Sequence, residues 1–400
     1  MVRPTAGHLV AATILSLLVA GLYGAISSRV FVNSSDYADH LTFAQNLYWS
    51  GRPPVPHFLF HALVAALYAV GLARSFAAAG QDVIVSCYVA IPVLLYGFLW
   101  ILFRNSRIGH PSILFLAGLA TLLAQPITLN HAYAVGFFWP EPYHSPTFIM
   151  LKPFAVAGLA CTAWYVSHSS RVNMRFAAGF ALATVAGSLS KPSFLICMVP
   201  AVTVLALYRL ARKLPVSVVG LLVGLYLPAA AVLGWQVWAT YSGHGTAEYQ
   251  DRVEWAPFKF MSYWAGHLVS KFVLSIAFPL TVTVVFWRQA RQDAILQLSW
   301  LCFLCGAFYT YTLAEAIHWR AGNFTWSGDI TAFTLLVGSV VFWLRQISLQ
   351  PAGKWSAQWA FWICGAVLVL HAISGARIDW FYLWHRGCAP NYQGGFVCGG

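Results

Sequence analysis

Residues Asn33 to His61 read NSSDYADHLTFAQNLYWSGRPPVPHFLFH, and this stretch decides how the rest of the chain is arranged. It holds Asp36, Asp39 and His40, although charged residues make up only 8% of the 400 residues. Ionisable side chains at a membrane boundary are costly unless they face water, a partner or a substrate. We therefore interpret the stretch as a polar loop at the mouth of an apolar bundle.

Outward from this stretch the chain is strongly apolar. Hydrophobic residues make up 60% of it, with 18 Trp and 28 Phe, whereas a soluble domain carries about 25% charged residues. Most of the apolar runs are long enough to cross a hydrocarbon core of roughly 30 Å as helices. The pattern predicts one all-α transmembrane bundle over residues 1–400. The net charge of +12 does not indicate nucleic-acid binding, because the basic residues lie singly or in pairs at the ends of apolar runs.

The topology depends on residues 57–72, an apolar run that is short for a span. If this run stays at the interface, one side of the membrane holds a large set of basic residues and a single acidic residue, Asp293. The other acidic residues lie apart from this set. That set comprises Arg3, Arg104, Arg107, Arg171, Arg175, Arg209, Arg212, Lys213, Arg288, Arg291, Arg345 and Lys354. The positive-inside rule then places these residues, and the N-terminus, in the cytoplasm. We predict an amphipathic helix over 36–50 and a juxtamembrane helix from residue 57.

About eleven crossings follow, with the C-terminus outside. Their ranges are 9–28, 81–103, 111–129, 148–167, 176–190, 192–211, 215–239, 264–287, 294–313, 329–346 and 356–375. The outer side then holds the first loop, 33–80, and a Gly-rich tail over 376–400. Cys388 and Cys398 in this tail can form a disulfide in an oxidising compartment. Cys302 and Cys305 lie in an apolar span, and we interpret both as core residues.

Asp36 and Asp39 are three residues apart and share one face of a helix. Such a pair can bind a divalent cation, Mg or Mn, or place one carboxylate as a general base. The alternative is helix capping by Asp36 or the serines before it. His57 and His61 are four residues apart on one predicted helical face, and we interpret them as interfacial histidines rather than zinc ligands.

The order of elements in residues 1–110 resembles the N-terminal third of the GT-C glycosyltransferases. The features that match are a first span, an outward loop starting SDYADH, an amphipathic helix, a Pro-Pro-x-Pro-His run opening a short helix, and a span ending in Arg. This superfamily includes protein O-mannosyltransferases, aminoarabinose transferases and oligosaccharyltransferases. Its first outer loop supplies an essential acid, and its donor is a sugar on a polyprenyl phosphate or diphosphate. The resemblance implies that Asp36 is this acid, with Asp39 as a second ligand or a structural partner.

Two later outer segments place ionisable residues beside aromatic ones: FFWPEPYHSPTFIMLKP (137–153) and TLAEAIHWRAGNFTWSGD (312–329). Arg, Lys and His can bind a lipid phosphate, and aromatic rings can stack on a sugar. The alternatives are an aromatic belt with a snorkelling Lys, and a loop whose charges pair internally. The candidate donor-binding and phosphate-binding residues are His144, Lys152, Lys191, Glu315, His318, Arg320 and Asn323.

The resemblance implies a glycosyltransferase, which we expect in the inner membrane of a bacterium and which transfers a sugar from a polyprenyl-phosphate donor to an unidentified acceptor of the cell envelope. A transporter or flippase for lipid-linked glycans is one alternative, and it predicts ionisable residues deep in the spans, which the sequence does not clearly show. A polymerase or ligase of surface polysaccharide is another. The transferase hypothesis requires that Asp36, His144, Lys191 and Glu315 share one outward chamber.

Overall fold

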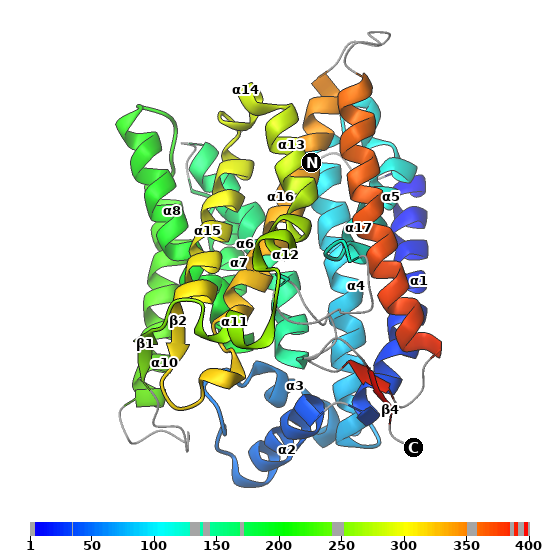
Figure 1. Cartoon of the computed structure of the whole chain (residues 1–400), viewed down its shortest axis with the longest axis vertical. Helices are drawn as coiled ribbons and strands as arrows, with labels where there is room; N and C mark the ends of the chain where they lie inside the picture. The colour runs from blue at the N-terminus through cyan, green and yellow to red at the C-terminus, as the bar shows by residue number, and fades with distance from the viewer. Residues whose placement is uncertain are drawn as a thin grey trace.

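The computed structural model describes residues 5–33, 35–128, 137–138, 145–168, 172–241, 252–349, 358–384, 388–390 and 396–398. These residues form an all-α bundle of long helices, with two short pairs of antiparallel strands (Figure 1). The first half contains α1 (Ala6–Asn33), α2 (Ser35–Ser50), α3 (Leu59–Ala69), α4 (Phe76–Phe103), η1 (Arg107–Gly109), α5 (Pro111–Leu123), α6 (Pro146–Ser167), α7 (Met174–Ser190) and α8 (Ser193–Ala211). The second half contains α9 (Val218–Leu221), η2 (Leu222–Tyr226), α10 (Leu227–Tyr241), β1 (Val253–Trp255), α11 (Lys259–Trp264), α12 (Leu268–Ser275), α13 (Ala277–Val285), α14 (Trp287–Ala290), α15 (Ala294–Thr312), β2 (Leu313–Glu315), η3 (Trp319–Ala321), α16 (Thr325–Leu349), α17 (Gln358–Trp384), β3 (Cys388–Pro390) and β4 (Phe396–Cys398).

The helices define a multi-pass membrane protein. Eight of the described helices are long and apolar enough to cross a bilayer, and α12 with α13, bent by 66°, would add a ninth. The other two expected crossings correspond to α5 and α7, which have only 13 and 17 residues. A count of eleven crossings therefore stays a prediction.

The helix α5 is short because α17 holds the chain that follows it. The expected span ran to residue 129, but α5 ends at Leu123. The backbone N–H of Gln125 then donates to the carbonyl of His371 at 3.0 Å, and Nδ1 of His371 donates to the carbonyl of Gln125 at 2.7 Å. This close approach needs Gly375, because a Cβ there would lie 1.5 Å from the Leu123 carbonyl oxygen. Non-helical backbone is tolerated inside the bundle because its polar groups are satisfied by protein.

The helices α2 and α3 lie across the end of the bundle drawn at the bottom of Figure 1, where β1 and β2 also lie. They occupy the positions expected for the two short helices of the first loop. The ring of Tyr68 in α3 stacks on Phe76, the first residue of α4, with centroids 4.2 Å apart. Arg104 caps the other end of the same 28-residue helix. Arg104 and the α2–α3 pair are therefore separated by about 40 Å of helix, at a rise of about 1.5 Å per residue.

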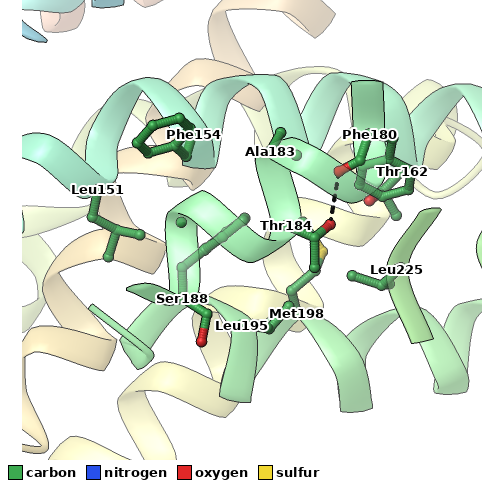
Figure 2. A pocket seen from close by; sticks show the side chains of 13 residues that line it. Leu151, Phe154, Thr162, Phe180, Ala183, Thr184, Ser188, Leu195, Met198 and Leu225 are labelled. Carbon is green, nitrogen blue, oxygen red and sulfur yellow. Dashed lines mark hydrogen bonds between the residues drawn. The ribbon is translucent and has the colours of Figure 1, made fainter. Parts of the chain in front are cut away.

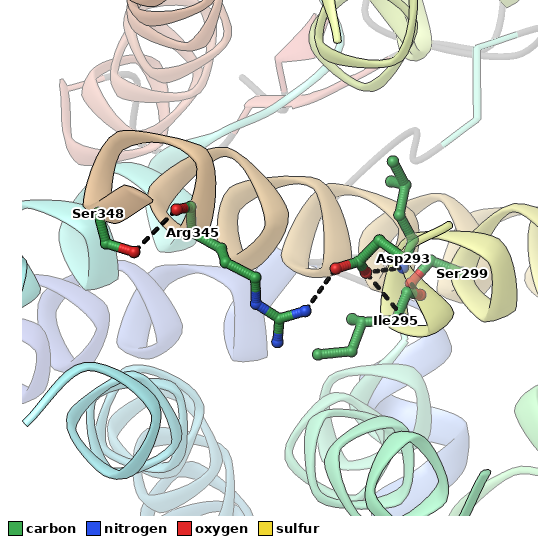
Figure 3. A network of polar contacts seen from close by, with 6 residues as sticks. Asp293, Ile295, Ser299, Arg345 and Ser348 are labelled. Carbon is green, nitrogen blue, oxygen red and sulfur yellow. Dashed lines mark hydrogen bonds and ion pairs between the residues drawn. The ribbon is translucent and has the colours of Figure 1, made fainter. Parts of the chain in front are cut away.

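At the end of the bundle opposite α2 and α3, Asp293 and Arg345 form an ion pair (Figure 3). The Oδ1 atom of Asp293 also accepts from the N–H groups of Ile295 and Leu296, both at 3.0 Å, and so caps α15. Asp293 is the one acidic residue that the charge pattern groups with the arginines. Its two oxygens are fully used by the cap and by Arg345, which explains its place there.

The C-terminal helix continues further than expected. The helix α17 runs to Trp384, whereas the expected span ends at residue 375 and the expected tail begins at 376. Beyond it, β3 and β4 pair so that Cys388 stands opposite Cys398. Opposed Cα atoms in an antiparallel pair are about 4.5–5.5 Å apart, a separation that a disulfide can bridge. The disulfide stays a prediction, while the expected core position of Cys302 agrees with its complete burial.

Candidate functional site

The site begins on α2, where Asp36 and Asp39 face different surroundings. Tyr37 and His40 on this helix are buried against the bundle, whereas Asp39 is exposed. Asp36 lies between these extremes, with 31% of its side-chain surface exposed. Its Oδ2 atom is nevertheless fully buried and accepts no hydrogen bond from the described residues. Asp36 therefore presents its remaining surface outward and one unsatisfied oxygen inward.

A histidine pair stands behind Asp36. Nε2 of His40 lies 3.7 Å from Asp36 Oδ2, and Nδ1 of His40 is hydrogen-bonded to Nε2 of His61 at 2.8 Å. The two rings stack with centroids 5.0 Å apart. Nδ1 of His61 is buried and has no hydrogen-bond partner among the described residues. The expected face shared by His57 and His61 is not formed, because α3 begins at Leu59 and His57 lies in the loop before it.

Lys191 interacts electrostatically with both Asp36 and His57. It lies outside the helices, as the C-cap of α7 just before α8. Desolvation lowers the pKa of Lys191 to about 8, while the Asp36 carboxylate acts in the opposite direction. Desolvation, reinforced by Lys191 and His61, lowers the pKa of His57 to about 3, and burial lowers the pKa of His61 to about 4. At neutral pH the imidazoles of His57 and His61 are therefore neutral.

Aromatic rings connect Lys191 to a second lysine. The Nζ atom of Lys191 lies 4.6 Å from the ring centroid of Trp326, and Trp326 lies 5.0 Å from the ring of Phe148. Lys152 Nζ lies 5.1 Å from the other ring of this pair, Phe148. A cation over an aromatic face is stabilised by the ring quadrupole. The two lysines therefore flank one pair of aromatic rings at the start of α6 and α16.

Around Lys152 the site continues into the long helices. Lys152 interacts electrostatically with Asp329 and Asp379, and all three side chains are buried. Asp379 accepts a hydrogen bond from the hydroxyl of Tyr23 at 3.2 Å. These groups come from α6, α16, α17 and α1, so helices far apart in sequence meet here. Buried charges in membrane helices commonly mark functional sites.

One glutamine in α10 holds the loop before His57. Nε2 of Gln236 donates to the carbonyls of Pro56 at 3.2 Å and Ser188 at 2.9 Å, and its Oε1 accepts from the Ser188 hydroxyl at 2.8 Å. The next ring contact in this region joins Phe58 and Trp235, with centroids 6.0 Å apart. The loop is therefore fastened to α10 on both sides of His57.

A small pocket lies on the other side of Ser188, between α6, α7, α8 and η2 (Figure 2). Its empty volume is about 310 Å³, open solvent included, and most of its lining is apolar. Thr184 within it donates to the carbonyls of Phe180 at 3.0 Å and Gly224 at 2.8 Å. The hydroxyl of Thr162 is buried and has no hydrogen-bond partner among the described residues. None of the charged candidates lines this pocket.

The late loop, residues 312–329, lies at the same end of the bundle as α2 and α3 and contains the strand β2 (Figure 1). β2 pairs with β1, which sets Glu315 opposite Val253. Glu315 accepts a hydrogen bond from the side-chain amide of Asn323 at 2.7 Å. Arg320 is exposed, and its guanidinium lies 5.3 Å from the ring of Trp319. His318 is half-buried just before this ring, and the loop reaches Lys191 through Trp326 at the start of α16.

The expected site residues therefore separate into groups. Asp36, Lys191 and Lys152 belong to one connected site, whereas Glu315, His318, Arg320 and Asn323 belong to the neighbouring late loop. His144 lies outside the described residues. Within the described part of the chain, no three His, Cys, Asp or Glu residues are placed to hold a metal ion, so the divalent cation at Asp36 and Asp39 stays a prediction.

Sequence reasoning missed two residues that complete the site. Gln236 and Asp379 bring the segments together, but only their polar or ionisable character inside an apolar chain signals them. No known family model matches the chain, and no curated protein matches it at a significant level in sequence. Function must therefore be inferred from the site and from the resemblance of the first segment.

Proposed function

We propose that this chain is a membrane glycosyltransferase of the GT-C type. It would transfer a sugar from a polyprenyl-phosphate donor to an acceptor hydroxyl on the non-cytoplasmic side of a bacterial inner membrane. The N-terminus is cytoplasmic and the C-terminus outside in this proposal, because Arg104 and Arg345 belong to the predicted cytoplasmic set and lie at the end of the bundle opposite α2 and α3. The observation that carries the proposal is the partly exposed Asp36 carboxylate, which interacts electrostatically with the Lys191 ammonium group.

The reaction needs a base and a stabilised leaving group. The acceptor oxygen attacks the anomeric carbon, the bond from that carbon to the phosphate oxygen breaks, and the hydroxyl proton passes to Asp36. The lipid phosphate leaves with its negative charge, which Lys191 and Lys152 can neutralise. Direct in-line attack inverts the configuration of the anomeric carbon. Lys191 and Lys152 are suited to this role because both lie at the aromatic pair formed by Trp326 and Phe148.

The late loop supplies further contacts in this proposal. Its exposed guanidinium, Arg320, can bind a phosphate by two parallel hydrogen bonds. Glu315 and Asn323 can accept and donate hydrogen bonds to sugar hydroxyls, and Trp319 offers a ring for stacking. A divalent cation, if used, would be held by Asp36 with oxygens of the donor phosphate and would supply charge neutralisation there.

The direct test replaces Asp36 by Asn and measures transfer from a polyprenyl-phosphate sugar in membranes. Loss of a general base is expected to slow transfer by about 10²-fold or more. Asp82→Asn is the matched control, because Asp82 is an exposed carboxylate near the start of α4, at the same end of the bundle. Equal activity of Asp36→Asn and wild type would remove Asp36 from the mechanism, and donor binding is measured alongside to exclude loss of the site.

A transporter or flippase for lipid-linked glycans is the second candidate. It is favoured by Lys152, Asp329 and Asp379, which are buried in helices long enough to span the membrane. Purified protein in proteoliposomes separates the two functions. Product formation without movement of the labelled lipid between leaflets supports the transferase, whereas movement without product supports transport.

A further inference from the structure

Gln236 connects two segments of the site that lie far from it in sequence. It is only 6% exposed, and its amide bonds to Pro56 and to Ser188. Pro56 immediately precedes His57, and Ser188 lies one turn of α7 before Lys191. We propose that Gln236 is a positioning residue, whose side-chain amide holds the 51–58 loop over the end of α7 and so keeps Lys191 shielded from water beside Asp36.

The chemistry of an amide suits this position. A glutamine side chain offers two N–H donors and one carbonyl acceptor. Here Nε2 donates to two backbone carbonyls of different segments, while Oε1 accepts a hydrogen bond from the Ser188 hydroxyl. The Ser188 hydroxyl is thus directed at Gln236. A carboxylate would lose both donors, and an apolar side chain would leave the buried carbonyls unsatisfied.

The loop itself needs such an attachment. Residues 51–58 contain three prolines, and Gly51 adopts a left-handed conformation at φ +68°, so the segment has no helix or strand to hold it. α10 contacts it at two adjacent positions, through the Gln236 amide and through the Trp235 ring on Phe58. His57 lies between these two attachments and interacts electrostatically with Lys191. Release of the Pro56 carbonyl would therefore let the loop move away from Lys191.

Three groups set the environment of the Lys191 amine. They are the Asp36 carboxylate from α2, the His57 imidazole from the loop and the Trp326 ring from α16. If the loop retreats, the amine gains water. Hydration favours the protonated form, so the pKa of Lys191 should rise.

The test follows the titration of Lys191 in the full chain in detergent or nanodiscs. The readout is the pH dependence of its labelling by an amine-reactive reagent, resolved by mass spectrometry of the Lys191 peptide. In wild type the midpoint is expected at about 8. In Gln236→Met it should rise by about one pH unit towards the ordinary lysine value of about 10.4.

Two further variants distinguish positioning from simple helix packing. Ser188→Ala removes one hydrogen bond between α7 and α10 but leaves both Nε2 bonds, so the midpoint should stay at the wild-type value. Gln346→Met replaces an equally buried glutamine, also 6% exposed, in α16, and it too should leave Lys191 unchanged. An unchanged midpoint in folded Gln236→Met, or an equal shift in Ser188→Ala, would overturn the proposal.

The catalytic consequence rests on the proposed transferase and is measured separately. Gln236→Met should raise the KM for the polyprenyl-phosphate sugar by about tenfold, the equivalent of one or two lost hydrogen bonds. Absence of sugar transfer by the wild-type protein would refute the transferase function. The Lys191 titration would still decide whether Gln236 positions this amine.

Discussion

Two aspartates at opposite ends of the bundle show how differently this chain treats the same side chain. Asp293 caps α15 with one oxygen and pairs with Arg345 through the other (Figure 3). Asp36 has an equally buried oxygen that accepts no hydrogen bond within the described residues. Both carboxylates lie near a cation, but only Asp293 is held by it in a direct ion pair.

The difference indicates two purposes. A satisfied carboxylate stabilises the fold, whereas burying a polar group without a partner costs free energy and persists only where something else requires it. The same contrast holds for the cations, because Arg345 contacts its partner directly while Lys191 is desolvated over an aromatic ring. Under the transferase proposal, Asp36 is therefore the carboxylate used for chemistry, whereas Asp293 is the one that stabilises the fold.

The comparison predicts that acid destabilises the protein mainly through the Asp36 end. The folded-state pKa values of His57 and His61, about 3 and about 4, lie below the ordinary value of about 6.5. Between these values the unfolded chain binds more protons, so stability is lost as pH falls from 6.5 towards 4. Two histidines give a maximum slope of about 2.7 kcal/mol per pH unit. Unfolding followed against pH in detergent measures this slope.

The variants for this measurement are chosen from both ends. The double substitution His57→Gln and His61→Gln should reduce the loss of stability between pH 6.5 and pH 4, which we call the acid limb of the stability curve. His8→Gln is the control, because His8 is a buried histidine that bonds the hydroxyl of Tyr96 near the opposite end. If the acid limb survives in the double variant and disappears in His8→Gln, the assignment of acid sensitivity to the Asp36 end is wrong.

The second prediction compares the aspartates directly by their contribution to stability. Asp293→Ala removes a helix cap and leaves Arg345 without its partner, so we expect a loss of about 1–2 kcal/mol. Asp36→Asn keeps the shape of the side chain and removes an unsatisfied charge, so it should cost less than half as much. Thermal unfolding of both purified variants gives the ranking. A larger loss for Asp36→Asn would mean that Asp36 is a structural carboxylate.

The membrane class of the chain could be predicted because it depends on composition and on the length of the apolar runs. Apolar runs and basic clusters identify helices and their ends without any knowledge of packing. The early end of α5 is an instructive exception. Pro126 signals a break within the apolar run, since helices tend to end before a proline. The hydrogen bonds that hold the segment after α5, however, join Gln125 to His371, which is 246 residues away in the sequence.

The candidate site was only partly predictable for the same reason. Asp36 and Lys191 stand out as ionisable residues in an apolar chain. The contacts that define their surroundings join residues distant in sequence, such as Gln236 with Pro56, 180 residues apart, and Tyr23 with Asp379, 356 residues apart. Local spacing contains no information about such pairs. It also misplaced His57 on a helical face, because three prolines delay the start of α3.

The smallest predicted effect is a difference in sign between the stability changes caused by replacing Lys191 and by replacing Arg345. Lys191→Met removes a desolvated ammonium group and keeps an unbranched chain against Trp326, so stability at pH 7 should be unchanged or slightly raised. Arg345→Met leaves Asp293 with only its cap and should lower stability by about 1 kcal/mol. Both proteins are compared by thermal unfolding, with binding of a polyprenyl-phosphate sugar measured in parallel. Under the transferase proposal the more stable Lys191→Met is the one that loses donor affinity. If instead both substitutions destabilise equally, Lys191 is as well paired as Arg345 and the contrast between the two ends does not reflect function.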